Sequence, residues 1–339
     1  MGVNKYPNTW QIPAGTRDLL PGEAKRRREM EARLVKVFEQ RKYQEVVTPV
    51  LEYFDTLAVD LGEEIGGELY RLLDRDGRLL VLRPDMTTPI ARLVSTRLRN
   101  KPLPLRLFYV ANVFRYESPQ AGRLREFGQA GVELIGLAGP EADAEIIALS
   151  VEALQLAGLR DFQICLGEIQ VINGIMEDTN LSEAVVRALK GAMALKDLVG
   201  LENLLVQNEV PIQKQEMVLG ISNLYGGPEV LNEARQLTSN PRALQALDYL
   251  EKVWACLVDL GVDSFVRLDL GILRGFEYYT GIVFEGYTSD LGYPLCGGGR
   301  YDNLLGKFGY PCPATGFAVG LERLILALDG QKKREPDLA

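Results

Sequence analysis

Three separated arginines in this chain have residue neighbours that suit an anion-binding site. Arg115 stands in VFRYE, Arg274 in ILRGFEYY and Arg323 in GFAVGLERL, each among apolar or glycine residues. An unpaired charge in such surroundings is expensive, and a planar guanidinium matches a carboxylate or a phosphate. The pattern therefore indicates a pocket for an anionic ligand. An ordinary ion pair of Arg115 with Glu117, on a solvated face of a strand, is the alternative interpretation.

A second group of polar residues follows the first arginine along the chain. Gln129 and Glu133 have the same strand parity, with Gly131 between them, and Arg123 and Arg125 precede them. Side chains of equal parity project from one face of a strand, and a glycine leaves room there. A recess lined by polar groups is predicted, and a solvated sheet face is the alternative.

The segment LRPDMT places Asp85 and Thr87 just before a predicted helix. Both residue types are also ordinary helix caps, so capping alone would explain them. The glycine-rich LCGGGRYDNL, residues 295 to 304, lacks the lysine and the spacing of a P-loop and does not match GxGxxG. Glycines inside a strand more often mark a close approach to the backbone.

Composition limits the chemistry that this chain can perform. Its 339 residues are 47% hydrophobic, carry a net charge of −8 and include no histidine. Mechanisms that need an imidazole base or a histidine metal ligand are excluded, and carboxylates, Arg, Lys and Tyr remain. The acidic balance disfavours nonspecific nucleic-acid binding. No metal site is expected, because the four cysteines, which we expect to be reduced, are scattered.

Location and secondary structure follow from hydrophobic patterning. No stretch is long and apolar enough to span a bilayer, and residues 1–13 lack a secretory signal pattern, so a cytoplasmic protein is expected. An amphipathic helix is predicted from Pro21 to Arg41, and a strand with an edge or bend at Pro49 from 43 to 54. A hairpin turning at 74–78 and a helix from about Thr87 follow.

The remaining segments predict an α+β fold with a mainly antiparallel sheet. A second hairpin spans 105 to 137, a helix 140 to 158 and a strand 161 to 167, and residues 168 to 260 are mostly helical. Strands at 265–270, 278–287 and 293–299 precede a helix from about 316 to 328. Hairpin-connected strands with helices gathered elsewhere disfavour a doubly wound fold.

Several of these segments resemble known motifs. FRYESPQAGRLREFGQAGVELIG resembles motif 2 of class II aminoacyl-tRNA synthetases in its histidyl form, and GFAVGLERL resembles motif 3. LRGFEYYTGIVFEGY is similar to the histidine-binding signature of histidyl-tRNA synthetases and their paralogues, and CGGGRYDNLL to the glycine-rich strand after it. The predicted helix and strand through Thr48 and Pro49 resemble the motif 1 dimer element. The resemblance covers about Gly15 to Leu328.

The resemblance implies roles for named residues. Free histidine would be bound through its α-amino group by Asp85, Thr87 and Gln129. Its imidazole would meet Glu133 and Tyr279, beside Tyr278, and its carboxylate Arg274. Anion or ATP phosphate binding, as a vestige of the synthetase reaction, would fall to a second set: Arg115, Glu117, Arg123 and Arg323.

Departures from the synthetase pattern favour a regulatory paralogue. The pattern has Glu where Asp85 stands, Gly at Met86 and His at Gly128, and it continues into an anticodon-binding domain of about a hundred residues. One synthetase-like domain, 1–330, with a helical insertion at about 170–260 and a short tail, 331–339, is expected instead.

The chain thus resembles the regulatory subunits of ATP phosphoribosyltransferase. That family implies a non-catalytic subunit without a cofactor of its own, which dimerises, joins a short-form catalytic subunit in a hetero-octamer and confers feedback inhibition by histidine. Neither a membrane nor tRNA is an expected partner. A truncated enzyme that forms histidyl-adenylate is the first alternative, and a tRNA-binding module is the second.

Overall fold

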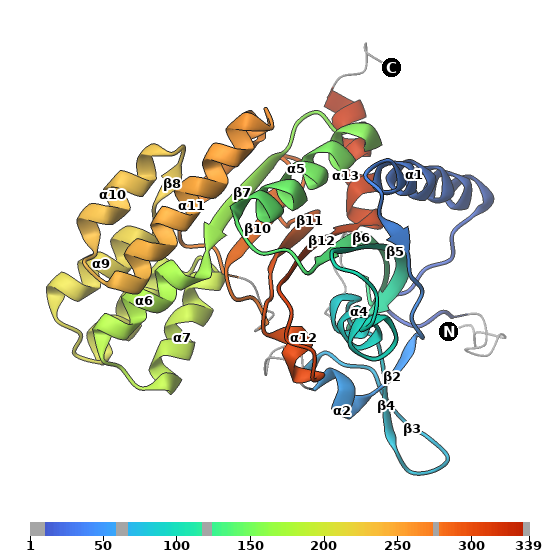
Figure 1. Cartoon of the computed structure of the whole chain (residues 1–339), viewed down its shortest axis with the longest axis horizontal. Coiled ribbons are helices and arrows are strands. Elements are labelled where there is room, and N and C mark those ends of the chain that lie inside the picture. The colour runs from blue at the N-terminus through green and yellow to red at the C-terminus, as the bar shows by residue number, and fades with distance from the viewer. Residues whose placement is uncertain (1–10, 59–66, 117–123, 274–277, 335–339) are drawn as a thin grey trace, which may run out of the picture.

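A mixed, mainly antiparallel sheet of nine strands runs through the molecule (Figure 1). The computed structural model describes residues 11–58, 67–116, 124–273 and 278–334. Two pairings are parallel, β1 with β5 and β7 with β9. The strands lie in the order β1 (Gln44–Glu45), β5 (Leu105–Phe114), β6 (Glu126–Ile135), β12 (Ala314–Gly320), β11 (Cys296–Arg300), β10 (Ile282–Tyr287), β7 (Gln163–Glu168), β9 (Val266–Asp269) and β8 (Tyr225–Gly226). The predicted α+β class is confirmed.

Three helices pack together against one face of this sheet, α1 (Pro21–Gln40), α5 (Pro140–Ala157) and α13 (Leu321–Arg334). The predicted first helix is confirmed. Its side chains at helical spacing, among them Leu34 and Phe38, are fully buried. The Phe38 ring lies 5.8 Å from that of Phe108 and 6.1 Å from that of Phe317, which are on β5 and β12. This aromatic contact joins α1 to the centre of the sheet.

The opposite face is covered by smaller elements. These are α2 (Phe54–Leu57), α4 (Thr87–Leu93) with its π-helical continuation Val94–Leu98, α12 (Leu304–Lys307) and a separate sheet of β2 (Leu51–Tyr53), β4 (Leu79–Leu82) and β3 (Arg71–Leu73). The first predicted hairpin is confirmed in β3 and β4, which turn at Gly77. A second buried cluster, which includes Met86, Ile90, Tyr109 and Tyr301, fills this side. It supplies the rigid surroundings of the candidate site.

Residues between β7 and β9 are mostly helical, as predicted, and lie at the left of Figure 1. They form α6 (Ile169–Thr179), α7 (Glu183–Ala194), α8 (Leu198–Gln207), α9 (Ile212–Ser222), α10 (Glu229–Leu237) and α11 (Pro241–Asp259), followed by a short 3-10 turn, Asp263–Phe265. Side chains of Ser182, Asp197 and Asn240 cap three of the helix N-termini. Helix α11 packs on both α5 and α6. Division of the chain into a synthetase-like domain with an insertion stays a prediction.

Two predicted elements differ from the structure. The predicted strand 43–54 is divided at its proline into β1 and β2, which belong to different sheets. The predicted helix from 316 to 328 was wrong in its first part, because residues 314–320 form β12 and α13 begins at Leu321. Phe317 and Val319 alternate with small residues in this segment, and β12 lies between β6 and β11. Because β12 is hydrogen bonded to a strand on each side, its residues adopt the two-residue period of a strand and not the period of a helix.

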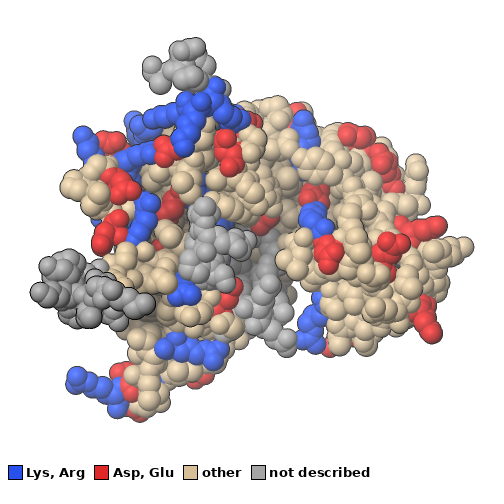
Figure 2. Space-filling view, turned by 180° about the vertical axis from the view of Figure 1, so that it is seen from behind, with Lys and Arg blue, Asp and Glu red and all other residues tan. Residues whose placement is uncertain are grey.

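The surface carries a local concentration of positive charge. Basic side chains gather where α13 ends, in the upper part of Figure 2, and the last turn of that helix holds Lys332, Lys333 and Arg334. No helix in the described part of the chain is long and apolar enough to cross a membrane. All four cysteines are free thiols, and three of them are buried.

Candidate functional site

A small cavity of about 40 Å³ lies on the face of the sheet opposite α1 and α5. It brings together six of the seven residues predicted to bind histidine: Asp85, Thr87, Gln129, Glu133, Tyr278 and Tyr279. They come from three places, namely the β4 to α4 connection, strand β6 and the residues before β10. Arg115, from the end of β5, lines the same cavity. The structure therefore brings most of the predicted residues together, and their role in binding stays a prediction.

Glu133 is the central polar group of this cavity. Its side chain is 2% exposed, and it accepts a hydrogen bond of 2.8 Å from the Thr87 hydroxyl at Oε1. The Tyr301 hydroxyl donates to the other oxygen, Oε2. Burial raises the pKa of Glu133 to about 8, although the two hydrogen bonds act in the opposite direction. The two hydrogen bonds thus hold the carboxyl group in one orientation, and burial favours its protonated form.

Aromatic rings enclose the carboxyl groups. The Tyr278 ring lies 4.7 Å from that of Tyr279 and 5.7 Å from that of Tyr301, between ring centroids. The Tyr278 hydroxyl donates to Asp85 Oδ2 at 3.4 Å, and Asp85 is 5% exposed. Two carboxyl groups and four phenols, those of Tyr109, Tyr278, Tyr279 and Tyr301, therefore line one cavity. Such a site can offer both donors and acceptors to a flat, polar ring.

Two glycines make this packing possible. A Cβ atom on Gly316 of β12 would collide with the Glu133 carboxyl oxygen, and one on Gly131 would lie 2.6 Å from the Tyr109 hydroxyl. The room predicted beside Gly131 exists, but Tyr109 occupies it. Tyr109 and Tyr301 are site residues that the sequence reasoning missed. Strand parity could have found Tyr109, because it is paired with Gly131 across β5 and β6.

The two predicted arginines that the structure describes, Arg115 and Arg323, do not converge on one point. Arg115 donates from Nε to the Pro84 carbonyl oxygen at 2.9 Å, which fixes it beside Asp85. Arg323 is absent from the cavity lining; it donates to the Pro294 carbonyl at 2.7 Å and lies over the Tyr293 ring. Arg274, Glu117 and Arg123 lie outside the described residues. Their predicted roles stay predictions.

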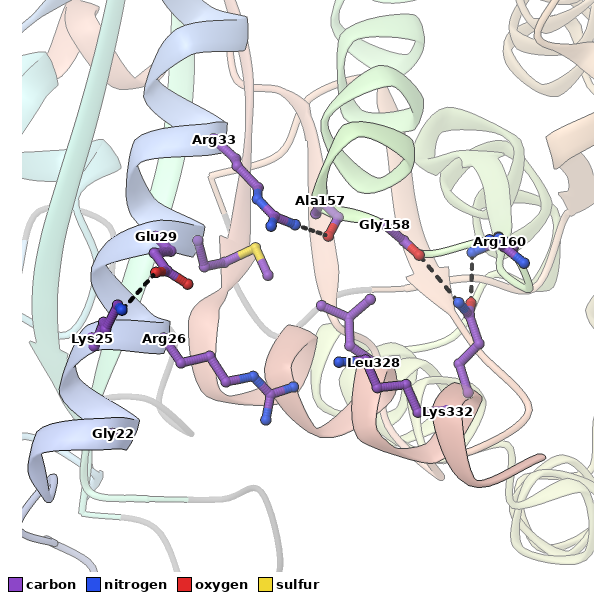
Figure 3. A pocket seen from close by; sticks show the side chains of 12 residues that line it. Gly22, Lys25, Arg26, Glu29, Arg33, Ala157, Gly158, Arg160, Leu328 and Lys332 are labelled. Carbon is purple, nitrogen blue, oxygen red and sulfur yellow. Dashed lines mark hydrogen bonds and ion pairs between the residues drawn. The ribbon is translucent and has the colours of Figure 1, made fainter. Parts of the chain in front are cut away.

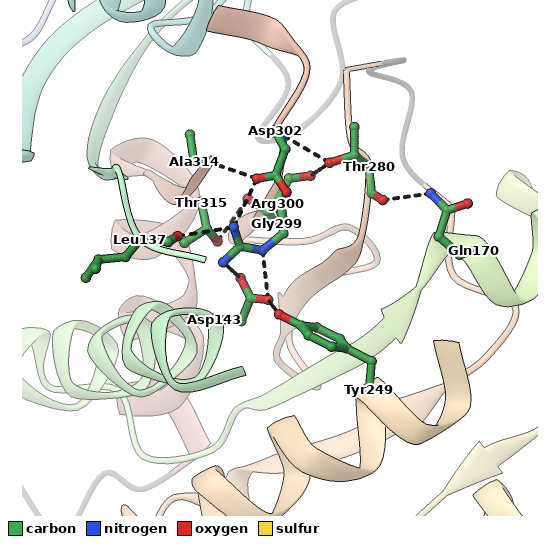
Figure 4. A network of polar contacts seen from close by, with 10 residues as sticks. All are labelled: Leu137, Asp143, Gln170, Tyr249, Thr280, Gly299, Arg300, Asp302, Ala314 and Thr315. Carbon is green, nitrogen blue, oxygen red and sulfur yellow. Dashed lines mark hydrogen bonds and ion pairs between the residues drawn. The ribbon is translucent and has the colours of Figure 1, made fainter. Parts of the chain in front are cut away.

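A buried ion pair supports the site from the opposite face of the sheet (Figure 4). Arg300, next in sequence to Tyr301, binds Asp143 of α5 through contacts of 2.8 and 3.0 Å, and both side chains are buried. The Tyr249 hydroxyl of α11 donates to the same carboxylate at 2.7 Å. Burial by itself lowers the pKa of Arg300, but the charge and hydrogen bonds of Asp143 raise it by more, so the pKa lies above its ordinary value. The guanidinium therefore stays charged.

The same network reaches the segment before β10. The Thr280 backbone N–H donates to the Arg300 carbonyl at 2.8 Å, and the Gln170 side chain of α6 donates to the Thr280 carbonyl at 2.7 Å. Thr280 follows Tyr279, so the residues that position the two tyrosines are hydrogen bonded to the helices on the other side. The cavity is thereby connected to α5, α6 and α11.

Comparisons with known proteins identify the family to which this chain belongs. The family model of histidyl-tRNA synthetase matches residues 15–324. An ATP phosphoribosyltransferase regulatory subunit from Moorella thermoacetica is 53% identical over 319 residues, which are 94% of this chain and 82% of that protein. This chain belongs to the family of ATP phosphoribosyltransferase regulatory subunits. The counterpart from Desulforamulus reducens is 48% identical, over 94% of this chain and 79% of that protein.

A solved structure supports the same assignment. The crystal structure of an ATP phosphoribosyltransferase regulatory subunit/histidyl-tRNA synthetase from Bacillus halodurans has a TM-score of 0.88 and 37% identity, and the match covers 95% of this chain and 84% of that one. The predicted family and its synthetase-like fold are confirmed. The curated relatives are named regulatory subunits, which is consistent with the predicted non-catalytic role.

Proposed function

We propose that this chain supports a short-form ATP phosphoribosyltransferase and makes it sensitive to histidine, which binds in the Glu133 cavity. The observation that carries the proposal is the arrangement of Glu133 between Thr87 and Tyr301, with Asp85 and Tyr279 beside it. A neutral imidazole has one donor and one acceptor, and a protonated carboxyl group beside a phenol can complement both. Analogues that leave these buried groups unpaired would be rejected.

The size of the cavity implies a change of shape on binding. A volume of about 40 Å³ is far below the roughly 300–1,000 Å³ that is typical of small-molecule sites. Histidine is much larger, so the tyrosines around Glu133 must move to admit it. A ligand that binds one conformation better than another shifts the population between them. The closed cavity thus gives histidine a physical means of regulating an attached subunit.

Phosphoribosyl transfer by a short-form catalytic subunit tests the proposal directly. The rate is measured with and without this chain across a histidine titration. We expect the chain to raise the rate and histidine to lower it again. Glu133→Gln should weaken inhibition by histidine while leaving the activation unchanged, because the residue is remote from the surface. Activation with unchanged inhibition in this variant would place the effector site elsewhere, and the absence of activation would reject the regulatory role.

We also propose that the chain has no synthetase activity, needs no cofactor and dimerises within a hetero-octamer without binding tRNA. The position of Arg115 in the cavity favours the competing function, formation of histidyl-adenylate. Histidine-dependent exchange of pyrophosphate into ATP separates the two. Exchange that is lost in Arg115→Ala would establish the enzyme, whereas no exchange with the protein in large excess would support the regulatory role.

Native mass spectrometry of this chain mixed with the catalytic subunit tests the proposed hetero-octamer. The same measurement with histidine tRNA added tests whether tRNA binds.

A further inference from the structure

A larger cavity lies between helices α1, α5 and α13 and shares no lining residue with the Glu133 cavity (Figure 3). Its volume is about 560 Å³, which is within the range of roughly 300–1,000 Å³ that is typical of small-molecule sites. Buried side chains form part of its lining: Met30, Ala157, Leu328 and Gln331. It is therefore a concave site with a partly apolar floor rather than a flat charged patch.

The rim of this cavity is strongly basic. Its lining includes five cationic side chains and one carboxylate, that of Glu29; the cations are Lys25, Arg26, Arg33, Arg160 and Lys332. The chain as a whole has a net charge of −8. The local excess of positive charge is therefore opposite in sign to the average and gives the cavity a potential that attracts anions.

Some of these cations also hold the helices together. Arg26 pairs with Asp329 of α13 at 2.6 Å, and Arg33 donates to the Ala157 carbonyl at 3.4 Å. Gln331 accepts from the Arg160 backbone N–H at 2.8 Å and donates to the Gly158 carbonyl at 3.1 Å. Two carbonyls at the end of α5 are thus hydrogen bonded, at a helix C-terminus whose dipole is compensated by nearby cations.

Other cations keep most of their donor capacity. Lys332 makes no hydrogen bond or ion pair with the described part of the chain, and Lys25 approaches Glu29 only at 4.0 Å. Arg33 uses one long hydrogen bond of the five that a guanidinium can donate. Helix packing alone therefore does not account for the charge around the cavity.

We propose that this cavity binds an organic molecule that carries at least two phosphate groups. Each exposed cation contributes little binding free energy in water, so a ligand with one phosphate group would be held weakly. A diphosphate can contact several of these cations at once. The apolar part of the ligand would lie on Met30 and Leu328. The proposal is independent of histidine binding, because the two cavities are separate.

Titration calorimetry at low ionic strength, with pyrophosphate and ADP as probes, tests the site. The double variant Arg33→Glu with Lys332→Glu reverses two rim charges. Both side chains are exposed, so the fold should be retained, and circular dichroism checks this. A matched control, Lys36→Glu with Lys252→Glu, makes the same charge change at exposed positions outside the lining. We expect one ADP per chain, bound about tenfold more weakly by the rim variant and unchanged in the control.

The remaining outcomes decide the details. Weaker binding at high salt is expected from screening. ADP that binds more tightly than pyrophosphate would support the contact with the apolar floor, and equal affinities would overturn that part. Binding that is lost in Arg115→Ala but kept in the rim variant would assign the anion to the Glu133 cavity. An equal loss in the rim and control variants, or no binding at all, would overturn the proposed site.

Discussion

At the scale of single residues, the Glu133 carboxyl group gives the proposed histidine binding an expected dependence on pH. Free Glu133 has a pKa of about 8, and a histidine side chain has one of about 6.5. If the complex holds a single shared proton between carboxyl and imidazole, then no net proton is exchanged on binding between these two values. Affinity should therefore be highest there and fall up to tenfold per pH unit on either side.

Isothermal titration calorimetry from pH 5.5 to 9 measures this profile. In Glu133→Gln the affinity should no longer fall above pH 8, because an amide does not titrate. The fall below about pH 6.5 should remain, because it comes from the ligand. An affinity that stays flat above pH 8 in the natural chain would show that Glu133 does not share a proton with the ligand.

The same carboxyl group should affect stability in the absence of histidine. Its pKa is near 4.5 when unfolded and about 8 when folded, so the folded state binds the extra proton between these values. The free energy of unfolding should then decrease as pH rises from 4.5 to 8 and stay constant above pH 8. The decrease is on the order of 1.4 kcal/mol for each unit by which the pKa is raised, a few kcal/mol in all. Glu133→Gln should reduce this dependence in urea unfolding at pH 5 and pH 8. If the free energies of unfolding at pH 5 and pH 8 differ as much in Glu133→Gln as in the natural chain, the raised pKa of Glu133 is contradicted.

At the scale of elements, the sequence predicted the parts whose pattern is local. Helix α1 and the two hairpins follow from spacing and turn residues that lie close together in the chain. The segment GFAVG was misassigned because its small residues allow either period, and only its neighbours β6 and β11 select the strand. Tyr301 was missed for a similar reason. Its contact with Glu133 joins residues 168 positions apart, which no local pattern reveals.

The Arg300 network should make the contact between sheet and helices cooperative. Asp143→Ala removes the more deeply buried of the two carboxylates that pair with Arg300 and leaves Asp302, which should cost about 3 kcal/mol, whereas Tyr249→Phe removes one neutral donor and costs about 1. Tyr225→Phe is a matched control, because its hydroxyl bonds to Gln163 at an exposed position. Chemical unfolding of the three variants and of the Asp143, Tyr249 double variant measures the coupling. Additive losses in the double variant would show that Tyr249 acts independently of Asp143.

At the scale of the whole molecule, the proposed regulation can be tested as a coupling between binding of histidine and binding of the catalytic subunit. Coupling between two sites is reciprocal, so a partner that changes histidine affinity by some factor must have its own affinity changed by histidine by the same factor. Couplings of about 1–3 kcal/mol are usual, which corresponds to roughly 5–150-fold. We therefore expect histidine affinity measured with the catalytic subunit present to differ from that of the chain alone by at least about fivefold. Subunit affinity with and without saturating histidine, from analytical ultracentrifugation, should change by that ratio. Equal histidine affinities in the free and assembled chain would mean that the Glu133 cavity, however well it binds histidine, transmits nothing to the partner through equilibrium binding.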